Sequence, residues 1–121
     1  MASYNEPVTE LSPAAREIHR GLASIIEELE AIDWYHQRID VSGVEDLKAV
    51  LTHNRDEEIE HMSMVLEWVR RQMPEFDQQL RRYLFTSAPL TEIERAAEEG
   101  TAAPSALPSG GGDLGIGKLA G

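Results

Sequence analysis

Residues 44–68, VEDLKAVLTHNRDEEIEHMSMVLEW, carry the clearest structural pattern of the chain. Its apolar side chains recur at alternating steps of three and four residues, which predicts a long helix with one packed face. This seam passes through Val44, Leu47, Leu51, Asn54, Glu58, His61, Val65 and Trp68. Glu58 and His61 stand where Val or Leu would be expected, and burying them unpaired would cost several kcal/mol. The polar middle of the seam therefore predicts a bound cation.

A second long helix is predicted just before this one, over about residues 13–39. Ser12 followed by Pro13 is a typical helix start. The same alternation runs through Ile18, Leu22, Ile25, Leu29, Ile32, His36 and Ile39. After a short break at residues 40–42, Ser42-x-x-Glu45 reads as a capping box that opens a helix over about residues 43–73, ended by Pro74. A loop this short makes the two helices antiparallel neighbours.

The remaining segments are shorter. We expect a flexible N-terminus (residues 1–11), further helices at about 75–85 and 90–99, a flexible linker at 100–112 and a distinct tail at 113–121, so that residues 12–99 form the helical domain. Two helices with one apolar stripe each cannot surround a core. The predicted fold is therefore all-α: an antiparallel two-helix hairpin plus a short C-terminal helix, which dimerises into a ferritin-like four-helix bundle.

Composition narrows the class of partner. The 22 acidic residues outnumber the 11 basic ones, for a formal net charge of -11, which argues against nucleic acid and favours cations or a basic protein surface; plain solubility is the alternative explanation. There is no cysteine, which excludes disulfides, thiolate metal sites and Cys nucleophiles. No segment resembles a signal peptide or a membrane span, so we expect a cytoplasmic protein.

Glu58 and His61 lie three residues apart and therefore on the same face of a helix, so both can bind one ion. Glu28 flanks the other stripe beside Leu29. It lies about 16 Å from the loop at the helical rise, against about 21 to 25 Å for Glu58 and His61, so the three come nearly level. This is half the ligand set of a ferritin-like di-iron site, and a two-fold axis would supply the other half. Such ligands suit iron or manganese better than copper, although zinc would also bind.

Other interpretations stay open at this point. Glu58 and His61 can be a solvated pair on an acidic helix. Glu27 and Glu30 can form a weaker cation site or an ordinary exposed face of the helix. Tyr35, on the same face as Glu28, is a hydrogen-bond donor near the metal, a redox-active ring or an interface aromatic. The Gly-rich C-terminus is either featureless or an extended peptide that fills small pockets on a partner through Leu114, Ile116 and Leu119.

Three segments of the chain resemble the encapsulated ferritins, the ferritin-like cargo of bacterial encapsulin compartments. They are residues 27–38 (EELEAIDWYHQR), residues 53–61 (HNRDEEIEH) and the tail DLGIGKL at residues 113–119, which is similar to a cargo-loading peptide. The resemblance covers nearly all of residues 12–86 plus the tail.

The resemblance implies a set of site residues. The ferroxidase ligands fall on Glu28, Glu58 and His61, repeated by a dimer mate. The peripheral acids through which iron enters fall on Glu27 and Glu30, and the Trp-Tyr step near the metal falls on Trp34 and Tyr35. The tail would dock on the shell through Leu114, Ile116 and Leu119.

The resemblance also implies an assembly and an activity. Family members form a homodecamer, a ring of five dimers, and oxidise ferrous iron with oxygen for mineral storage inside an encapsulin nanocompartment. The expected function is therefore an encapsulated ferroxidase with a di-iron centre between subunits. The alternatives are a non-catalytic metal-stabilised scaffold, a rubrerythrin-like peroxide reductase and an adaptor that acts only through its tail.

Overall fold

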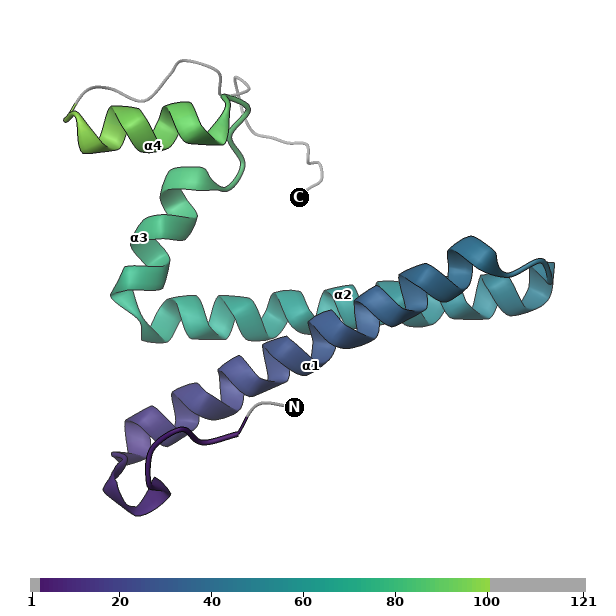
Figure 1. Ribbon diagram of the computed structural model, residues 1–121, viewed down its shortest axis with the longest axis horizontal. Helices are drawn as coiled ribbons and strands as arrows, with labels where there is room; N and C mark the ends of the chain where they lie inside the picture. Colours follow the sequence, from purple (N-terminus) through teal and green to yellow (C-terminus); the bar gives the residue numbers. More distant parts are fainter. Residues whose placement is uncertain (1–2, 101–121) are drawn as a thin grey trace. The chain divides into compact units, whose positions relative to one another are not determined.

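The computed structural model describes residues 3–100 of the chain, and all regular structure in that range is helical, as predicted (Figure 1). The order of elements is η1 (Val8–Glu10), α1 (Pro13–Val41), α2 (Glu45–Gln72), α3 (Pro74–Tyr83) and α4 (Leu90–Glu98). The chain divides into two compact units between Pro74 and Glu75, and each is considered by itself. The predicted tail and nearly all of the predicted linker lie outside the described residues.

The first unit is built on the antiparallel hairpin of α1 and α2, the two long helices joined by a tight loop in Figure 1. Ser12 starts α1: its hydroxyl accepts a hydrogen bond from the Ala15 N–H at 3.1 Å, and Pro13 follows at the first helical position. This satisfies one of the N–H groups that a helix start leaves unpaired. The predicted hairpin is therefore present, and α1 runs two residues past the predicted end.

The predicted capping box at the start of α2 is wrong. The Ser42 N–H still donates to the Arg38 carbonyl of α1, so Ser42 ends one helix and cannot begin the next. Its hydroxyl accepts the Val44 N–H at 3.3 Å inside the loop. Val44 is the N-cap residue of α2 and makes no side-chain cap hydrogen bond. The helix consequently starts at Glu45, whose carboxylate in the first turn suits the helix dipole.

Helix α1 comes into tight contact with α2 at Gly21, which is buried. A Cβ atom at this position would lie 3.1 Å from the side chains of both Trp68 and Val69. Val69 is fully buried. A side chain at position 21 would therefore require Trp68 and Val69 to shift, so this tight contact favours glycine and a close spacing of the two helices.

The hairpin itself covers its apolar residues only in part, and several of them on and beside the stripe stay exposed. Leu29, for example, keeps 49% of its surface exposed. Other large apolar side chains of the two helices are exposed in the same way: Ile26, Trp34, Val44, Leu47, Val50, Ile59, Met64 and Trp68. An unpartnered apolar face of this size marks an interaction surface.

The second unit contains most of α3 and the whole of α4. Its buried residues are Ala88, Ile93 and Ala96. Helix α3 ends two residues before the predicted boundary because the Tyr83 carbonyl accepts the Thr86 hydroxyl at 2.7 Å, and Phe85 takes up a left-handed backbone (φ 61°) that stops the helix. Phe85 is 87% exposed.

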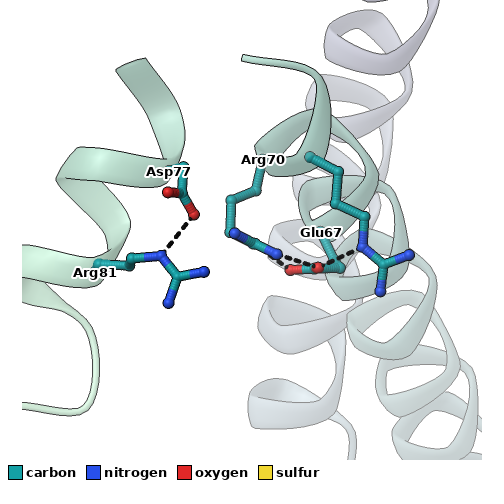
Figure 2. A network of polar contacts seen from close by, with 5 residues as sticks. Glu67, Arg70, Asp77 and Arg81 are labelled. Atoms are coloured by element: carbon teal, nitrogen blue, oxygen red, sulfur yellow. Dashed lines mark hydrogen bonds and ion pairs between the residues drawn. The ribbon is translucent and has the colours of Figure 1, made fainter. Parts of the chain in front are cut away.

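Charged pairs support the helix ends. Glu67 accepts hydrogen bonds of 2.7 Å from Arg70 and Arg71 in the last turns of α2, and Asp77 accepts one of 2.8 Å from Arg81 on α3 (Figure 2). The hydrogen bonds from Arg70 and Arg71 lower the pKa of Glu67 to about 2. Such exposed pairs add little stability individually. None of the helices within residues 3–100 combines the length and apolar content needed to cross a bilayer.

Candidate metal centre

The hairpin loop sets which residues of α1 and α2 come level. Glu28 lies as many residues before the end of α1 at Val41 as Glu58 lies after the start of α2 at Glu45. At a rise of ~1.5 Å per residue, both are about 20 Å from the loop. His61 follows on the same face of α2, one turn further on.

The structure brings together the three residues predicted as ligands. Glu28, Glu58 and His61 each offer a ligand atom, and these atoms lie within 4.8 Å of one another. The His61 Nδ1 atom lies 3.2 Å from Glu58 Oε1. All three side chains are half-buried rather than enclosed. One chain therefore forms a compact cluster that remains open to a further partner.

The electrostatics show two carboxyl groups competing for one proton. The hydrogen bond between Glu28 and Glu58, with partial burial, raises the pKa of Glu28 above its ordinary value. The same hydrogen bond lowers the pKa of Glu58. The hydrogen bond with Glu58 raises the pKa of His61. Each direction has a physical cause. The neighbouring carboxyl group disfavours ionisation of Glu28, hydrogen bonds to the Glu58 carboxylate favour its charged form, and nearby carboxylates favour the protonated form of His61.

The donor set fits a transition metal with oxygen and nitrogen preferences. Two carboxylates and one imidazole suit iron, manganese or zinc. Three ligands from one chain leave coordination positions unfilled, and a centre with two metals needs more carboxylate than this cluster holds.

A groove of about 350 Å³ adjoins the cluster along the hairpin. It is lined by Glu17, Arg20, Gly21, Ser24, Met64, Val65 and Trp68. Ser24 lies one turn before Glu28 on α1, and Val65 lies one turn after His61 on α2. The lining of the groove therefore begins about one helical turn from the cluster on each helix.

The other predicted residues of this region surround the cluster without joining it. Glu27 and Glu30 are exposed on α1, and the charge of Glu27 adds to the upward shift in the pKa of Glu28. Trp34 is 51% exposed. Tyr35 is half-buried, with the Arg38 guanidinium 5.4 Å from its ring centroid.

Two polar contacts near the cluster were not predicted from the sequence. The His61 Nε2 atom lies 3.9 Å from Glu57 Oε1, one turn back along α2. Arg55 bridges the two helices by a 3.2 Å contact with the Nδ1 atom of His36. The contact of Glu57 with His61 could have been inferred from their four-residue spacing on one helix. The contact of Arg55 with His36 could not, because it depends on how the two helices are aligned.

The fold and the cluster together define a class of protein. Paired helices that present glutamates and a Glu-x-x-His motif to a shared face are the half-site of carboxylate-bridged dimetal proteins built on helical bundles. Comparison with known proteins shows the family of the chain: the pattern of the EncFtn-like family matches residues 3–87, and the chain belongs to that family. The resemblance inferred from the sequence is thereby confirmed.

Relatives that cover 74% or more of the chain carry matching descriptions. A ferritin-like protein of Thermotoga maritima is 50% identical, over 96% of both chains. An encapsulated ferritin-like protein of Rhodospirillum rubrum is 49% identical, over 98% of this chain and 89% of its own length. The encapsulin nanocompartment cargo protein EncC of Myxococcus xanthus is 38% identical, over 74% and 73%.

A solved structure supports the fold. The crystal structure of protein ne0167 from Nitrosomonas europaea superposes with a TM-score of 0.72 at 52% sequence identity. The match covers 74% of this chain and 98% of that one.

Proposed function

We propose that this protein is a ferroxidase that oxidises Fe(II) to Fe(III) with dioxygen at a di-iron site between two copies of the chain. The ferric product would be stored as mineral inside an encapsulin shell. The observation that carries the proposal is the meeting of Glu28 from α1 with Glu58 and His61 from α2, ligand atoms within 4.8 Å, in a member of the EncFtn-like family.

A second copy supplies what one chain lacks. The cluster contains three ligands, whereas two metal ions need about twice that number. The exposed stripe and the groove beside the cluster form an apolar surface suited to a two-fold contact. Pairing two hairpins across this surface yields a four-helix bundle with both ligand sets inside.

Each ligand has a distinct role in the proposed reaction. Four glutamates, Glu28 and Glu58 from each chain, would neutralise the four positive charges of two ferrous ions. His61 gives each ion a nitrogen ligand. Every ferrous ion oxidised releases one electron, and dioxygen takes up these electrons together with protons from solvent. Carboxylates stabilise the higher charge of the ferric product, which favours oxidation.

The residues around the cluster complete the proposal. Glu27 and Glu30 lie exposed on α1, where they can attract ferrous ions toward Glu28. Trp34 and Tyr35 lie further along the same helix and would contact the centre from outside its ligands.

The proposed location is the cytoplasm, in the interior of an encapsulin nanocompartment. Two relatives of this chain are described as encapsulated or as encapsulin cargo. The tail at residues 113–121 is the proposed docking peptide, with Leu114, Ile116 and Leu119 as its apolar contacts. The hairpin dimers would assemble into a homodecamer of five dimers.

Oxygen uptake on mixing with ferrous iron tests the activity. We expect uptake by the unaltered protein and a drop of at least about tenfold for Glu58→Ala or His61→Ala, because removing even an outer partner of a metal ligand costs about that much. Glu60→Ala is the matched control, since Glu60 is an exposed acid of the same helix segment.

Two results would contradict the proposal. Iron binding without oxygen uptake would identify a metal-stabilised scaffold. Faster oxidation by peroxide than by oxygen would identify a peroxide reductase.

A further inference from the structure

The two ring nitrogens of His61 face two different carboxylates. Nδ1 lies 3.2 Å from Glu58 Oε1, on the side of the cluster. Nε2 lies 3.9 Å from Glu57 Oε1. Glu57 and Glu58 are consecutive in the sequence, so one turn of α2 presents both carboxylates to the same imidazole.

The chemistry of a neutral imidazole makes the two sides unequal. One nitrogen carries a lone pair that can bind metal, and the other carries the proton. Because Nδ1 is the nitrogen that adjoins Glu58, the lone pair of Nδ1 is the one that would bind a metal ion held by the cluster. The proton then resides on Nε2, and the carboxylate placed to accept it is that of Glu57.

We propose that Glu57 is a positioning residue, which accepts the Nε2–H of His61 and thereby fixes the tautomer and orientation of the ring for metal binding. The inference rests on the proposed metal centre. Metal-bound histidines typically donate their second ring N–H to a carboxylate or carbonyl, and this partner raises the basicity of the ligand.

The surroundings of Glu57 allow this role. His61 is its ion-pair partner within residues 3–100, at a side-chain exposure of 49% for Glu57 and 45% for His61. A charge-assisted hydrogen bond would be ~2.8 Å long, so the carboxylate must move by about 1 Å. An exposed side chain can do so by a small rotation of its terminal torsions.

The test measures the affinity of the full-length protein for Co²⁺, with binding monitored by visible absorption. We expect Glu57→Ala to weaken binding by about tenfold. Glu57→Gln keeps an acceptor oxygen at the same place and should regain most of the affinity. Glu60→Ala removes the same charge from the same segment, and should leave the affinity unchanged, which separates positioning from general electrostatics.

A second readout reports the tautomer directly. With Zn²⁺ bound, ¹⁵N resonances of His61 should show metal on Nδ1 and a proton on Nε2. Metal on Nε2, or equal Co²⁺ affinity for the unaltered protein and Glu57→Ala, would overturn the inference. If Glu58→Ala abolishes binding while Glu57→Ala does not change it, only this inference fails; if neither affects binding, the proposed metal centre fails with it.

Discussion

At the scale of single residues, Glu28 and Glu58 are held so close that their pKa values move apart, upward for Glu28 and downward for Glu58. The metal-free site therefore keeps a proton on Glu28 to higher pH than a free glutamate does. His61 likewise keeps its proton above its ordinary pKa of 6.5. At any pH where these groups hold their protons, metal binding must displace them.

Metal binding should consequently release protons and strengthen as pH rises. The raised pKa values of Glu28 and His61 stabilise the metal-free fold below their ordinary values, 4.5 and 6.5, and this contribution is lost as pH rises through the shifted values. The stability of the metal-bound fold should instead increase as pH rises, because the metal ion no longer competes with those protons for the ligands.

Calorimetric titration with Zn²⁺ in buffers of different ionisation enthalpy counts the protons released. We expect release to be largest below the ordinary pKa of His61, 6.5, and smaller in Glu28→Gln at the acidic end. Zinc binding with no proton release at any pH would show that the ligands are not these groups.

The cluster of Glu28, Glu58 and His61 could be predicted from the sequence because helical periodicity alone places Glu58 and His61 on the seam and Glu28 beside it. Glu57 could not be predicted as a partner of His61. The seam pattern places it off the packed face, and its contact with Nε2 depends on a side-chain rotamer.

At the scale of elements, the spacing of α1 and α2 depends on Gly21. The Trp68 and Val69 side chains fill the space that any larger residue would need. The metal ligands lie on both helices, about two turns from this contact. A change at Gly21 should therefore affect both stability and the geometry of the cluster.

Replacing this glycine tests the packing. Gly21→Leu should lower the free energy of unfolding by about 1–3 kcal/mol through overpacking against Val69. Gly43→Leu is the matched control, because nothing lies within 4 Å of a Cβ at that loop position, and it should change stability by less than ~0.5 kcal/mol. Thermal unfolding of both variants measures the difference. Equal stability of the two would contradict the close contact.

The existence of the helices follows from their periodicity, whereas their ends depend on competition for single hydrogen bonds. Ser42 and Glu45 have the spacing of a capping box, but the Ser42 N–H is taken by the Arg38 carbonyl. The end of α3 is likewise set by Thr86 and the left-handed Phe85. Sequence spacing does not reveal which partner wins such contacts.

At the scale of the whole molecule, the hairpin leaves much of its apolar stripe in water. Burial of apolar surface contributes about 25 cal/mol per Å², so covering this face favours association strongly. The sequence predicted the need for a partner because two stripes cannot enclose a core. It could not specify how many copies assemble, since that depends on surfaces beyond the seam.

The tail should act independently of the metal centre. Truncation after residue 112 is expected to leave oxygen uptake unchanged and to abolish packaging in a co-expressed encapsulin shell. Replacing Leu114, Ile116 and Leu119 with serine should have the same effect, because apolar contacts would be lost while the length of the chain is kept. Purified shells analysed for cargo measure this; packaging of the truncated chain would contradict the assignment of the tail.

The central claim is that the metal centre belongs to a pair of chains. Native mass spectrometry under anaerobic conditions, with and without ferrous iron, tests it most directly. We predict that iron shifts the population from single chains toward dimers and their multiples with two irons per pair, and that Glu28→Ala remains distributed as the iron-free protein. Iron bound to single chains, with no change in the number of chains per particle, would contradict the account.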